Sequence, residues 1–408
     1  MPSRKGSDMT VGSEIPYLDF RASGFSTRSK SVRDARDRHW CAQTPFGYAV
    51  LRHREVGLLL RDKRLRQGSY AWPEINGLRG SFAEFWSRSV ISKEGETHRK
   101  LRSIAMPALA PEFIETLKPE FDRISDGLIA DLRNNETCEF MRDFSVPFAG
   151  LAICALLGLD NEHWDTLSSD ASDLGLAMGV DCELHESTFN AACDRLMILS
   201  TQLIERARSG KDQTRFVARL VKEAEKLGDI TDQELLDLVV ISIFGGVDTT
   251  RSQLGFAMGL FIQHPDQWQI LRNQPSLVPQ AIEEIIRAWP TTTWATREAV
   301  EDFEFQGQDI RRGETLHMLV HASARDPSIC KNPAFDITRK RKIHFGFGGG
   351  AHHCIGAQMA RTDMASALTA LVNNLEHFEY THEPEWLPDS GNTSPVRLPI
   401  RYSISRPE

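Results

Sequence analysis

Cys354 lies between a glycine-rich stretch that begins at Phe347 and a segment with the composition of a helix. A thiol at the N-terminal end of a helix is favoured as the thiolate by the unpaired N–H groups and the positive end of the helix dipole. Gly348, Gly350 and Gly356 leave bare backbone on both flanks, against which a flat, bulky cofactor can lie. We therefore interpret Cys354 as an axial ligand of haem iron.

Two other interpretations fit the same stretch. Most cysteines in a reduced chain are small buried hydrophobic residues. The glycines also match the relaxed dinucleotide-binding pattern Gly346-x-Gly348-x-x-Ala351, with a strand over 342–345 and Glu376 as the ribose-binding acid. Such a site needs strands and helices that alternate on both sides, and the preceding residues do not alternate in that way.

Gly245-Gly246-x-Asp248-Thr249-Thr250 is the second group of candidate chemical residues, in the middle of an apolar helical segment. Glycine inside a helix costs about 1 kcal/mol. Threonine hydroxyls divert hydrogen bonds from the preceding turn, so the helix can open and admit water or a small ligand. Asp248 then places an acid next to the hydroxyl of Thr249, as relayed proton transfer to a bound oxidant requires. A break between two helices with Asp248 as N-cap fits equally well.

Glu284-x-x-Arg287 is the third group, and its spacing puts both side chains on one face of a helix. Such pairs are usually exposed and contribute little to stability. Ile282, Ile285 and Ile286 give this helix an apolar side. The pair can therefore instead be buried and anchor a loop.

The composition is that of an ordinary globular protein. The 408 residues are 41% hydrophobic, and the net charge of −8 argues against nucleic acid as a partner because no basic excess is available for phosphates. Seven cysteines without paired spacing indicate reduced thiols. Residues 1–20 lack a secretory signal, and the apolar runs 148–159 and 238–247 are shorter than the roughly 20 residues of a membrane span. We expect a soluble, cytoplasmic monomer that does not contact a membrane.

Apolar residues recur at helical spacing through most of the chain, whereas β-type patterns are short. The predicted helices cover residues 111–134, 144–158, 186–208, 214–227, 232–264, 277–288 and 355–375. The predicted strands cover residues 47–52, 303–305, 315–320 and 396–403. We expect a mainly α fold with small β-sheets along one side. It forms one domain over 1–408, in which residues 1–20 are a flexible N-terminal segment.

Together, these three groups resemble the motifs of the cytochrome P450 haem-thiolate monooxygenases, in the order and at the separations of that family. The cysteine motif reads Phe347-Gly348-x-Gly350-x-His352-x-Cys354-x-Gly356. Further matches are Glu96-Thr97-His98-Arg99-Lys100-Leu101-Arg102, Pro107-Ala108-Leu109, Arg297-Glu298-Ala299 and Ala324-Arg325-Asp326-Pro327. The resemblance covers nearly the whole chain. It is to the soluble bacterial class I type and implies the P450 fold, a large helical region with a minor β-rich region.

The resemblance implies haem b, iron protoporphyrin IX, with Cys354 as the metal ligand. The two propionates of haem need cationic or hydrogen-bonding partners in a buried site. His98, Arg102, Arg297 and His352 stand where the family places such partners.

Further roles follow from the same resemblance. Phe347 would pack near the sulfur and limit solvent, and the backbone N–H groups beyond the ligand, as far as Gly356, would tune the reduction potential. Glu284, Arg287 and Arg339 would form a structural ion-pair network behind the haem.

The resemblance also implies a monooxygenase that uses O2 and a small-molecule substrate. Thr249 and Asp248 would organise proton delivery. Electrons would come from an acidic ferredoxin with its ferredoxin reductase, so NAD(P)H acts only indirectly. The cationic run 339–342, with Arg99 and Lys100, is the predicted docking surface for that ferredoxin.

The substrate is predicted only as a class. Bulky and aromatic residues at the candidate pocket positions favour a small to medium apolar or aromatic molecule, although the same aromatic residues fit an ordinary core. These positions are Phe82, Phe85, Trp86, Ile241, Phe244, Gly245, Thr293, Trp294 and Ser394. A peroxide-driven haem-thiolate peroxygenase and a non-catalytic haem sensor use the same ligand. Turnover with a ferredoxin, its reductase and NAD(P)H distinguishes a monooxygenase from both.

Overall fold

The computed structural model of the chain describes residues 15–179, 181–211, 213–340, 343–389 and 391–404. The helices are α1 Lys30–Arg38, α2 His53–Leu59, α3 Trp72–Ile75, α4 Ser81–Arg88, α5 Gly95–Ala108, α6 Pro111–Leu132, α7 Val146–Leu157, α8 Trp164–Gly175, α9 Glu186–Arg208, α10 Phe216–Leu227, α11 Asp232–Gln263, α12 Pro265–Asn273, α13 Val278–Ala288, α14 Val320–Ala324 and α15 Ala357–Asn374. The strands are β1 Cys41–Thr44, β2 Gly47–Val50, β3 Leu65–Gln67, β4 Thr137–Glu139, β5 Trp294–Ala299, β6 Phe303–Phe305, β7 Gln308–Ile310, β8 Thr315–Leu319, β9 Leu375–Tyr380, β10 Glu385–Trp386, β11 Pro395–Arg397 and β12 Pro399–Ile404. The prediction of a mainly α fold with small sheets is confirmed.

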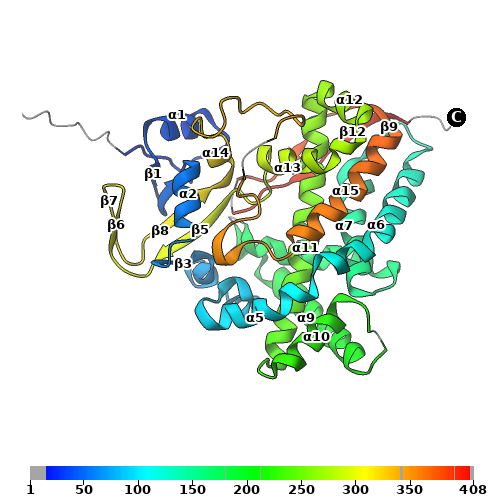
Figure 1. Cartoon of the computed structure of the whole chain (residues 1–408), viewed down its shortest axis with the longest axis horizontal. Helices are drawn as coiled ribbons and strands as arrows, with labels where there is room; N and C mark the ends of the chain where they lie inside the picture. Colours follow the sequence, from blue (N-terminus) through cyan, green and yellow to red (C-terminus); the bar gives the residue numbers. More distant parts are fainter. Residues whose placement is uncertain (1–14, 180, 212, 341–342, 390, 405–408) are drawn as a thin grey trace, which may run out of the picture.

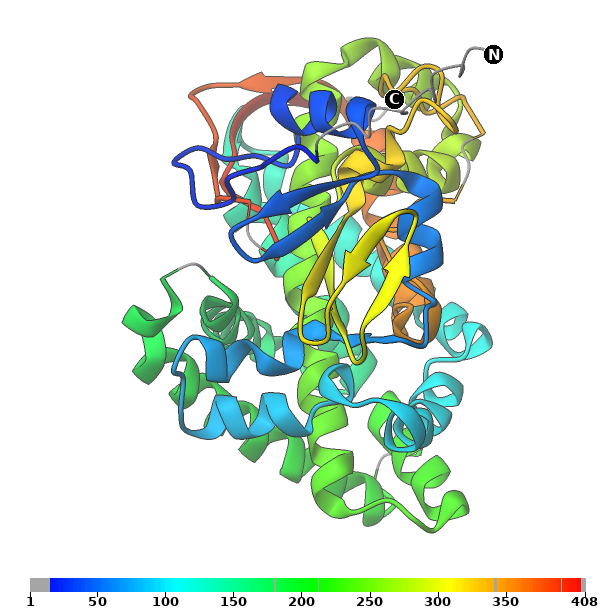
Figure 2. The same ribbon diagram turned by 90° about the vertical axis from the view of Figure 1, so that its left-hand side faces the viewer.

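The long helix α11 runs through the middle of the molecule, with helices on either side of it (Figures 1 and 2). Its start is fixed by a capping box: the N–H of Glu234 donates to the Thr231 hydroxyl at 3.2 Å, and the N–H of Thr231 donates to the Glu234 carboxylate at 2.9 Å. The helix is continuous from Asp232 to Gln263. A break with Asp248 as N-cap is therefore wrong, because the backbone stays helical through both glycines.

The main hydrophobic core lies between α11 and the helices α6, α7, α8, α9, α13 and α15. The α7 sequence is apolar on nearly all sides, and this helix accordingly packs against α6, α8 and α11 at once. Two smaller clusters lie against the largest sheet, near α1 and α2. Because α11 and α15 both line the main core, residues on these two helices can meet across it.

The largest sheet has five strands in the order β1-β2-β8-β5-β3 and forms one side of the molecule (Figure 2). Only β2 and β8 run parallel in it. Gln67 of β3 lies opposite Arg297 of β5. Because the N–H of Gln67 also donates to Glu94, just before α5, this register places Arg297 near the start of α5.

Two sequence expectations differ from the structure. The segment 396–403 is not one strand, because β11 pairs with β10 whereas β12 pairs with β4 and β9, so the chain changes sheets near Leu398. Residues 15–20 are not flexible: Leu18 is buried, and its N–H donates to the Gln43 carbonyl at 2.9 Å. The rest of the predicted flexible segment, residues 1–14, lies outside the described residues.

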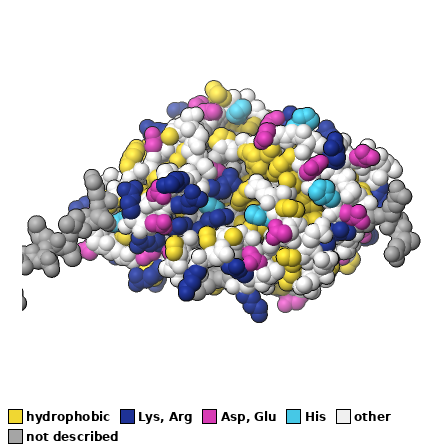
Figure 3. All heavy atoms as spheres, turned by 90° about the horizontal axis from the view of Figure 1, so that it is seen from above, with side chains coloured by type: hydrophobic (Ala, Val, Ile, Leu, Met, Phe, Trp, Pro, Cys, Tyr) yellow, Lys and Arg dark blue, Asp and Glu magenta, His cyan; other side chains and the backbone are white. Residues whose placement is uncertain are grey.

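The surface carries its charges unevenly. Seen from above, Lys and Arg side chains gather over the half of the molecule that holds α1, with acidic side chains between them (Figure 3). Lys30, Arg33 and Arg38 of α1 are exposed, and Lys30 pairs with Asp34 at 2.6 Å.

Candidate active site

The loop before Cys354 is shaped by glycine. Gly348 and Gly350 have φ angles of 70° and 68°, which L side chains rarely adopt, and a Cβ at Gly350 would overlap the carbonyl oxygen of Leu60. The turn brings the N–H of Cys354 within 2.9 Å of the Phe347 carbonyl oxygen. Cys354 is thereby held just before α15. The dinucleotide interpretation placed a strand over 342–345, and residues 343–345 do not form one, while residue 342 lies outside the described residues.

Cys354 is the exposed member of the seven cysteines, all of which lie in the described part of the chain. Desolvation by the surrounding protein atoms raises the pKa of the Cys354 thiol, although the residue as a whole is exposed, while the N–H of Gly356 and the charges of Arg102 and Arg361 act in the opposite direction. The helix-terminus N–H thus acts in the predicted direction, toward the thiolate, but desolvation outweighs it. Bonding to a metal cation would favour the thiolate form of Cys354 over the thiol.

Four predicted cofactor-binding residues come together beside this loop. The rings of His98 and His352 are 4.1 Å apart, and Arg102 donates to the His353 carbonyl at 2.8 Å. Arg297 is buried and donates to the Thr296 carbonyl at 3.0 Å. Elements distant in sequence, namely α5, β5 and the cysteine loop, thus supply one polar cluster.

Glu94 belongs to this cluster, although the sequence analysis did not select it. Its carboxylate accepts hydrogen bonds from the His352 ring at 2.9 Å and from the Gln67 N–H at 2.6 Å. Burial opposes ionisation of Glu94, but these hydrogen bonds and the nearby His98 hold its pKa below the usual range. Glu94 and His352 are 258 positions apart, and no sequence pattern links residues at that separation. The one available signal was that Glu94 lies just before the segment of His98 and Arg102.

The centre of α11 is open on one side and packed on the other. Nothing lies within 4 Å of a Cβ built on Gly245, whereas one on Gly246 would overlap the Ile153 side chain of α7. The hydroxyl of Thr249 donates back to the Gly245 carbonyl at 2.6 Å. The Thr249 hydroxyl thus contacts the carbonyl of the preceding turn, but the backbone stays helical, so the predicted local opening of the helix is not seen. Gly246 serves close helix packing.

Asp248 has a partner that the sequence analysis missed. Arg251 contacts Oδ1 of Asp248 through Nη2 at 2.5 Å and through Nε at 3.2 Å. The i,i+3 spacing that identified Glu284 and Arg287 was also available here. Thr250, two residues after Asp248, donates to the buried Asp363 of α15 at 3.3 Å.

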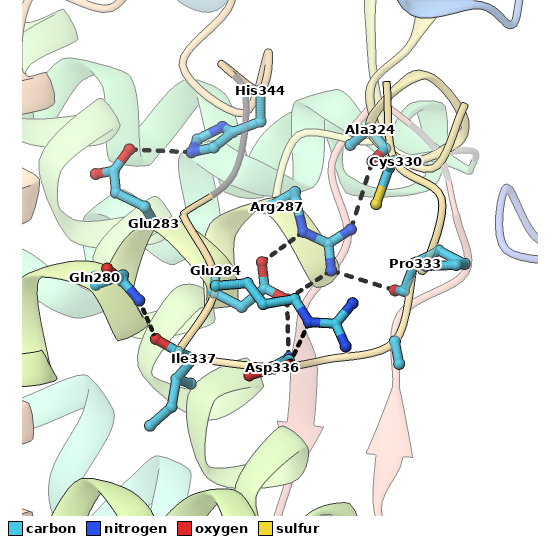
Figure 4. A network of polar contacts seen from close by, with 12 residues as sticks. Gln280, Glu283, Glu284, Arg287, Ala324, Cys330, Pro333, Asp336, Ile337 and His344 are labelled. Carbon is cyan, nitrogen blue, oxygen red and sulfur yellow. Dashed lines mark hydrogen bonds and ion pairs between the residues drawn. The ribbon is translucent and has the colours of Figure 1, made fainter. Parts of the chain in front are cut away.

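Glu284 and Arg287 form a buried ion pair, as the apolar side of α13 suggested. Two bonds of 2.6 and 2.7 Å join the side chains, and the N–H of Asp336 donates to Glu284 at 3.0 Å (Figure 4). Arg287 also donates to the Pro333 and Ala324 carbonyls at 3.3 and 3.5 Å. The pair therefore fixes the loop that follows α14.

Arg339 does not bond to either member of this pair among the described contacts. Its Nε lies 2.6 Å from the Asp336 carboxylate, and its side chain is 46% exposed. Arg339 is therefore part of the polar network around the pair without bonding to either member. Arg339 reaches the pair only through Asp336, whose backbone contacts Glu284.

The predicted pocket residues differ in their surroundings. Ile241 and Gly245 lie on the open side of α11, whereas Phe244 is buried and its ring would be 3.6 Å from a Cβ on Gly175 of α8. Five others are buried: Phe82, Phe85 and Trp86 in the core, and Thr293 and Ser394 in hydrogen-bonded loops. For these five the prediction is wrong, because packing within the protein already covers them. Trp294 contacts Phe20 and His317 but is only half-buried, so its place in the pocket stays a prediction.

Comparisons with known proteins agree on one family. The cytochrome P450 family profile matches residues 178–405. The luteothin monooxygenase of Streptomyces thioluteus is 34% identical over 96% of this chain and 97% of its own length. The nocardicin C N-oxygenase of Nocardia uniformis subsp. tsuyamanensis is 28% identical over 88% of this chain and 91% of its own. The solved structure of CalO2 superposes with a TM-score of 0.85 at 25% identity, covering 94% of this chain and 99% of CalO2.

The chain belongs to the cytochrome P450 family, and it is a haem-dependent monooxygenase. The fold expected from the resemblance is therefore also confirmed. None of the helices in the described part of the chain combines the length and the apolarity that a membrane span requires.

The residues beside the cysteine loop fit a haem. Nε2 of His98 is buried and has no hydrogen-bond partner, and Arg297 is buried without a carboxylate partner among the described residues. Burial and the charges of His352 and Arg102 lower the pKa of His98 to about 4, so this ring is a neutral donor. Two propionates would satisfy these groups, while the accessible Cys354 thiol would bind the iron.

Proposed function

We propose that this monooxygenase hydroxylates or otherwise oxidises a small to medium apolar or aromatic molecule, with electrons from an external acidic ferredoxin and its reductase. NAD(P)H would act only through these partners. The observation that carries the proposal is the accessible Cys354 thiol next to Arg102 and Arg361, on a chain whose α11 presents Asp248 and Thr249.

Haem bound through a thiolate supplies O2 activation. The protein's own residues would do the rest. Cys354 would hold the iron and Phe347, whose ring lies under the Arg361 guanidinium at 4.5 Å, would shield the sulfur. Asp248 would take protons from solvent, and Thr249 would present them on the substrate side of α11.

The propionates would be held from two directions. His98 and Arg102 lie on α5, one turn apart, and His352 stands in the cysteine loop. Arg297 approaches from β5, where burial lowers its pKa while nearby Glu94 raises it. An anion beside Arg297 would compensate its buried charge.

The class of substrate is supported by the apolar residues Ile241 and Phe244 beside Gly245. Some relatives carry names from natural-product metabolism, such as the polyketide biosynthesis cytochrome P450 PksS of Bacillus subtilis. One similar structure, P450BioI, is a complex with an acyl carrier protein that bears hexadec-9Z-enoic acid, at a TM-score of 0.84 and 26% identity over 91% of this chain and 98% of P450BioI. We propose a free apolar molecule here.

The function is tested by the ligand and by turnover. The reduced, CO-bound protein should show the thiolate-ligated spectrum, and Cys354→Ala should abolish it. A panel of apolar aromatic compounds should yield oxygenated product with ferredoxin, reductase and NAD(P)H. Thr249→Ala should divert the electrons to hydrogen peroxide. Product formed from hydrogen peroxide alone, with none from the electron-transfer chain, would contradict the proposal.

The ferredoxin surface is proposed around the cysteine loop rather than on the run 339–342. Arg341 and Lys342 lie outside the described residues, and Lys100 pairs with Glu234 at 3.0 Å. Arg61 and Arg99 are exposed and have no carboxylate partner among the described residues. Such charges can steer an acidic partner toward the thiolate side.

Charge reversal tests this surface. Arg61→Glu with Arg99→Glu should slow reduction by an acidic ferredoxin and flatten the dependence of its rate on ionic strength. Arg206→Glu, an exposed position on α9, is the matched control. If the double variant and the control give the same rate and the same salt slope, the surface is elsewhere.

A further inference from the structure

Arg251 holds the Asp248 carboxylate by one oxygen only. Both contacts, at 2.5 and 3.2 Å, are to Oδ1. The two side chains are largely buried, with 16% of Arg251 and 14% of Asp248 exposed. Oδ2 of Asp248 has no protein partner among the described residues. One oxygen is thus anchored and the other remains available for water.

The anchoring cation compensates an unfavourable position. A Cβ on Gly175, the last residue of α8, would lie 3.9 Å from Oδ1 of Asp248. The C-terminal end of a helix carries a partial negative charge, which disfavours a carboxylate beside it. Without Arg251, Asp248 would therefore tend to turn away from α8.

The alcohol of the proposed relay does not position the acid. Thr249 donates its hydroxyl proton to the Gly245 carbonyl at 2.6 Å, and no contact joins it to Asp248. The other neighbouring hydroxyl groups are also committed: Thr250 donates to Asp363, and Ser252 donates to the Asp248 carbonyl at 2.7 Å. Among these groups, only Arg251 contacts the Asp248 carboxylate.

We propose that Arg251 is the positioning residue for proton delivery in this protein. It fixes Oδ1 of Asp248, so that Oδ2 takes a proton from a solvent water molecule and releases it toward Thr249. The carboxylate is regenerated in each cycle, and the arginine neither gains nor loses a proton. This inference rests on the proposed roles of Asp248 and Thr249.

The test uses the haem-loaded protein with ferredoxin, reductase, NADPH and O2, in H2O and in D2O. Even without an identified substrate, O2 consumption and its division between hydrogen peroxide and water depend on proton delivery. Arg251→Gln should lower the rate about tenfold and increase the solvent isotope effect, since positioned proton transfer contributes factors of about 10²–10⁴. Arg251→Lys keeps the charge and should recover part of the rate.

Arg208→Gln is the matched control, because Arg208 also contacts a carboxylate of α11, Asp232, at 2.5 Å, but at the exposed start of the helix. It should match the wild-type rate and isotope effect. All variants are first compared by their CO-bound spectra. If Asp248→Asn slows proton delivery while Arg251→Gln and Arg251→Lys behave as wild type, the inference on Arg251 is overturned and the proposed function stands. If Asp248→Asn and Thr249→Ala also behave as wild type, the proposed relay itself fails.

Discussion

The centre of α11 and the region behind the cysteine loop each contain an acid followed three residues later by an arginine, and the two pairs have opposite surroundings. Glu284 and Arg287 are 1% and 2% exposed, and they bond through both carboxylate oxygens. Asp248 and Arg251 share a single oxygen and keep access to solvent. The same spacing therefore produces a rigid anchor in one place and an adjustable group in the other.

The difference follows from burial. A buried charge that loses its partner is destabilising by about 3–5 kcal/mol, so Glu284 and Arg287 cannot separate while the protein is folded. Asp248 and Arg251 are less completely buried, so water can replace part of a lost partner and breaking this pair should cost less. Asp248 can therefore exchange partners during a proton transfer, whereas Glu284 supports the fold around Cys354.

The largest expected effect is on the buried pair. Glu284→Gln leaves the Arg287 guanidinium buried without a counter-charge, and we expect a loss of about 3–5 kcal/mol in the free energy of unfolding. Urea unfolding followed by circular dichroism measures it. Glu385→Gln, which removes one member of the exposed pair with Arg397, should change stability by no more than about 0.5 kcal/mol. Equal losses in the two variants would remove the distinction made here.

Two glycine variants next compare the cysteine loop with the centre of α11. Gly350→Ala places a Cβ against the Leu60 carbonyl at a positive φ, and we expect it to cost about 1–3 kcal/mol and to weaken the thiolate-ligated CO spectrum. Gly245→Ala meets no atom within 4 Å and should stabilise α11 by up to about 1 kcal/mol. Thermal unfolding of both proteins decides the point. A stable Gly350→Ala protein would show that the loop is not closely packed.

Asp363 of α15 joins α11 to the helix that follows the cysteine loop. Burial raises its pKa well above the usual value, against the hydrogen bond from Thr250. The folded state thus retains a proton that the unfolded state releases, and stability falls as pH rises above the unfolded pKa. Asp363→Asn removes this penalty, so its advantage over wild type should grow by up to about 1.4 kcal/mol per pH unit.

Urea unfolding of wild type and Asp363→Asn at pH 5, 6 and 7 measures that difference. Asp131→Asn, at an exposed position of α6, controls for the general effect of removing a carboxylate. A constant difference between Asp363→Asn and wild type over this range would show that Asp363 is already ionised in the folded protein.

The smallest expected effect completes the comparison. Arg251→Gln should lower the free energy of unfolding by about 1 kcal/mol, because water reaches the largely buried pair only in part, and we expect a clear effect on proton delivery. The measurement is the urea midpoint at neutral pH. A loss as large as that of Glu284→Gln would mean that both pairs are structural anchors.

Much of this architecture could be predicted from single segments. The recurrence of apolar residues placed α9 at its observed bounds and α11 within one residue, because helix periodicity is a local property. The cysteine motif likewise depends on glycines that are adjacent in sequence. In contrast, the division of 396–403 between two sheets depends on which strands it pairs with: β11 pairs with β10, whereas β12 pairs with β9 and with the distant β4. The pattern within 396–403 does not contain that information.

The sequence by itself determined the family, the glycine-shaped loop around Cys354 and the spacing of both acid–arginine pairs. Only the tertiary structure decided which pair is buried, that Glu94 reaches His352, and that Arg339 contacts Asp336 instead of Glu284. The physical reason is that the strength of a charge interaction depends on the water around it. That water is excluded by segments far away in the chain, so residue types and spacing alone cannot fix the role of a pair.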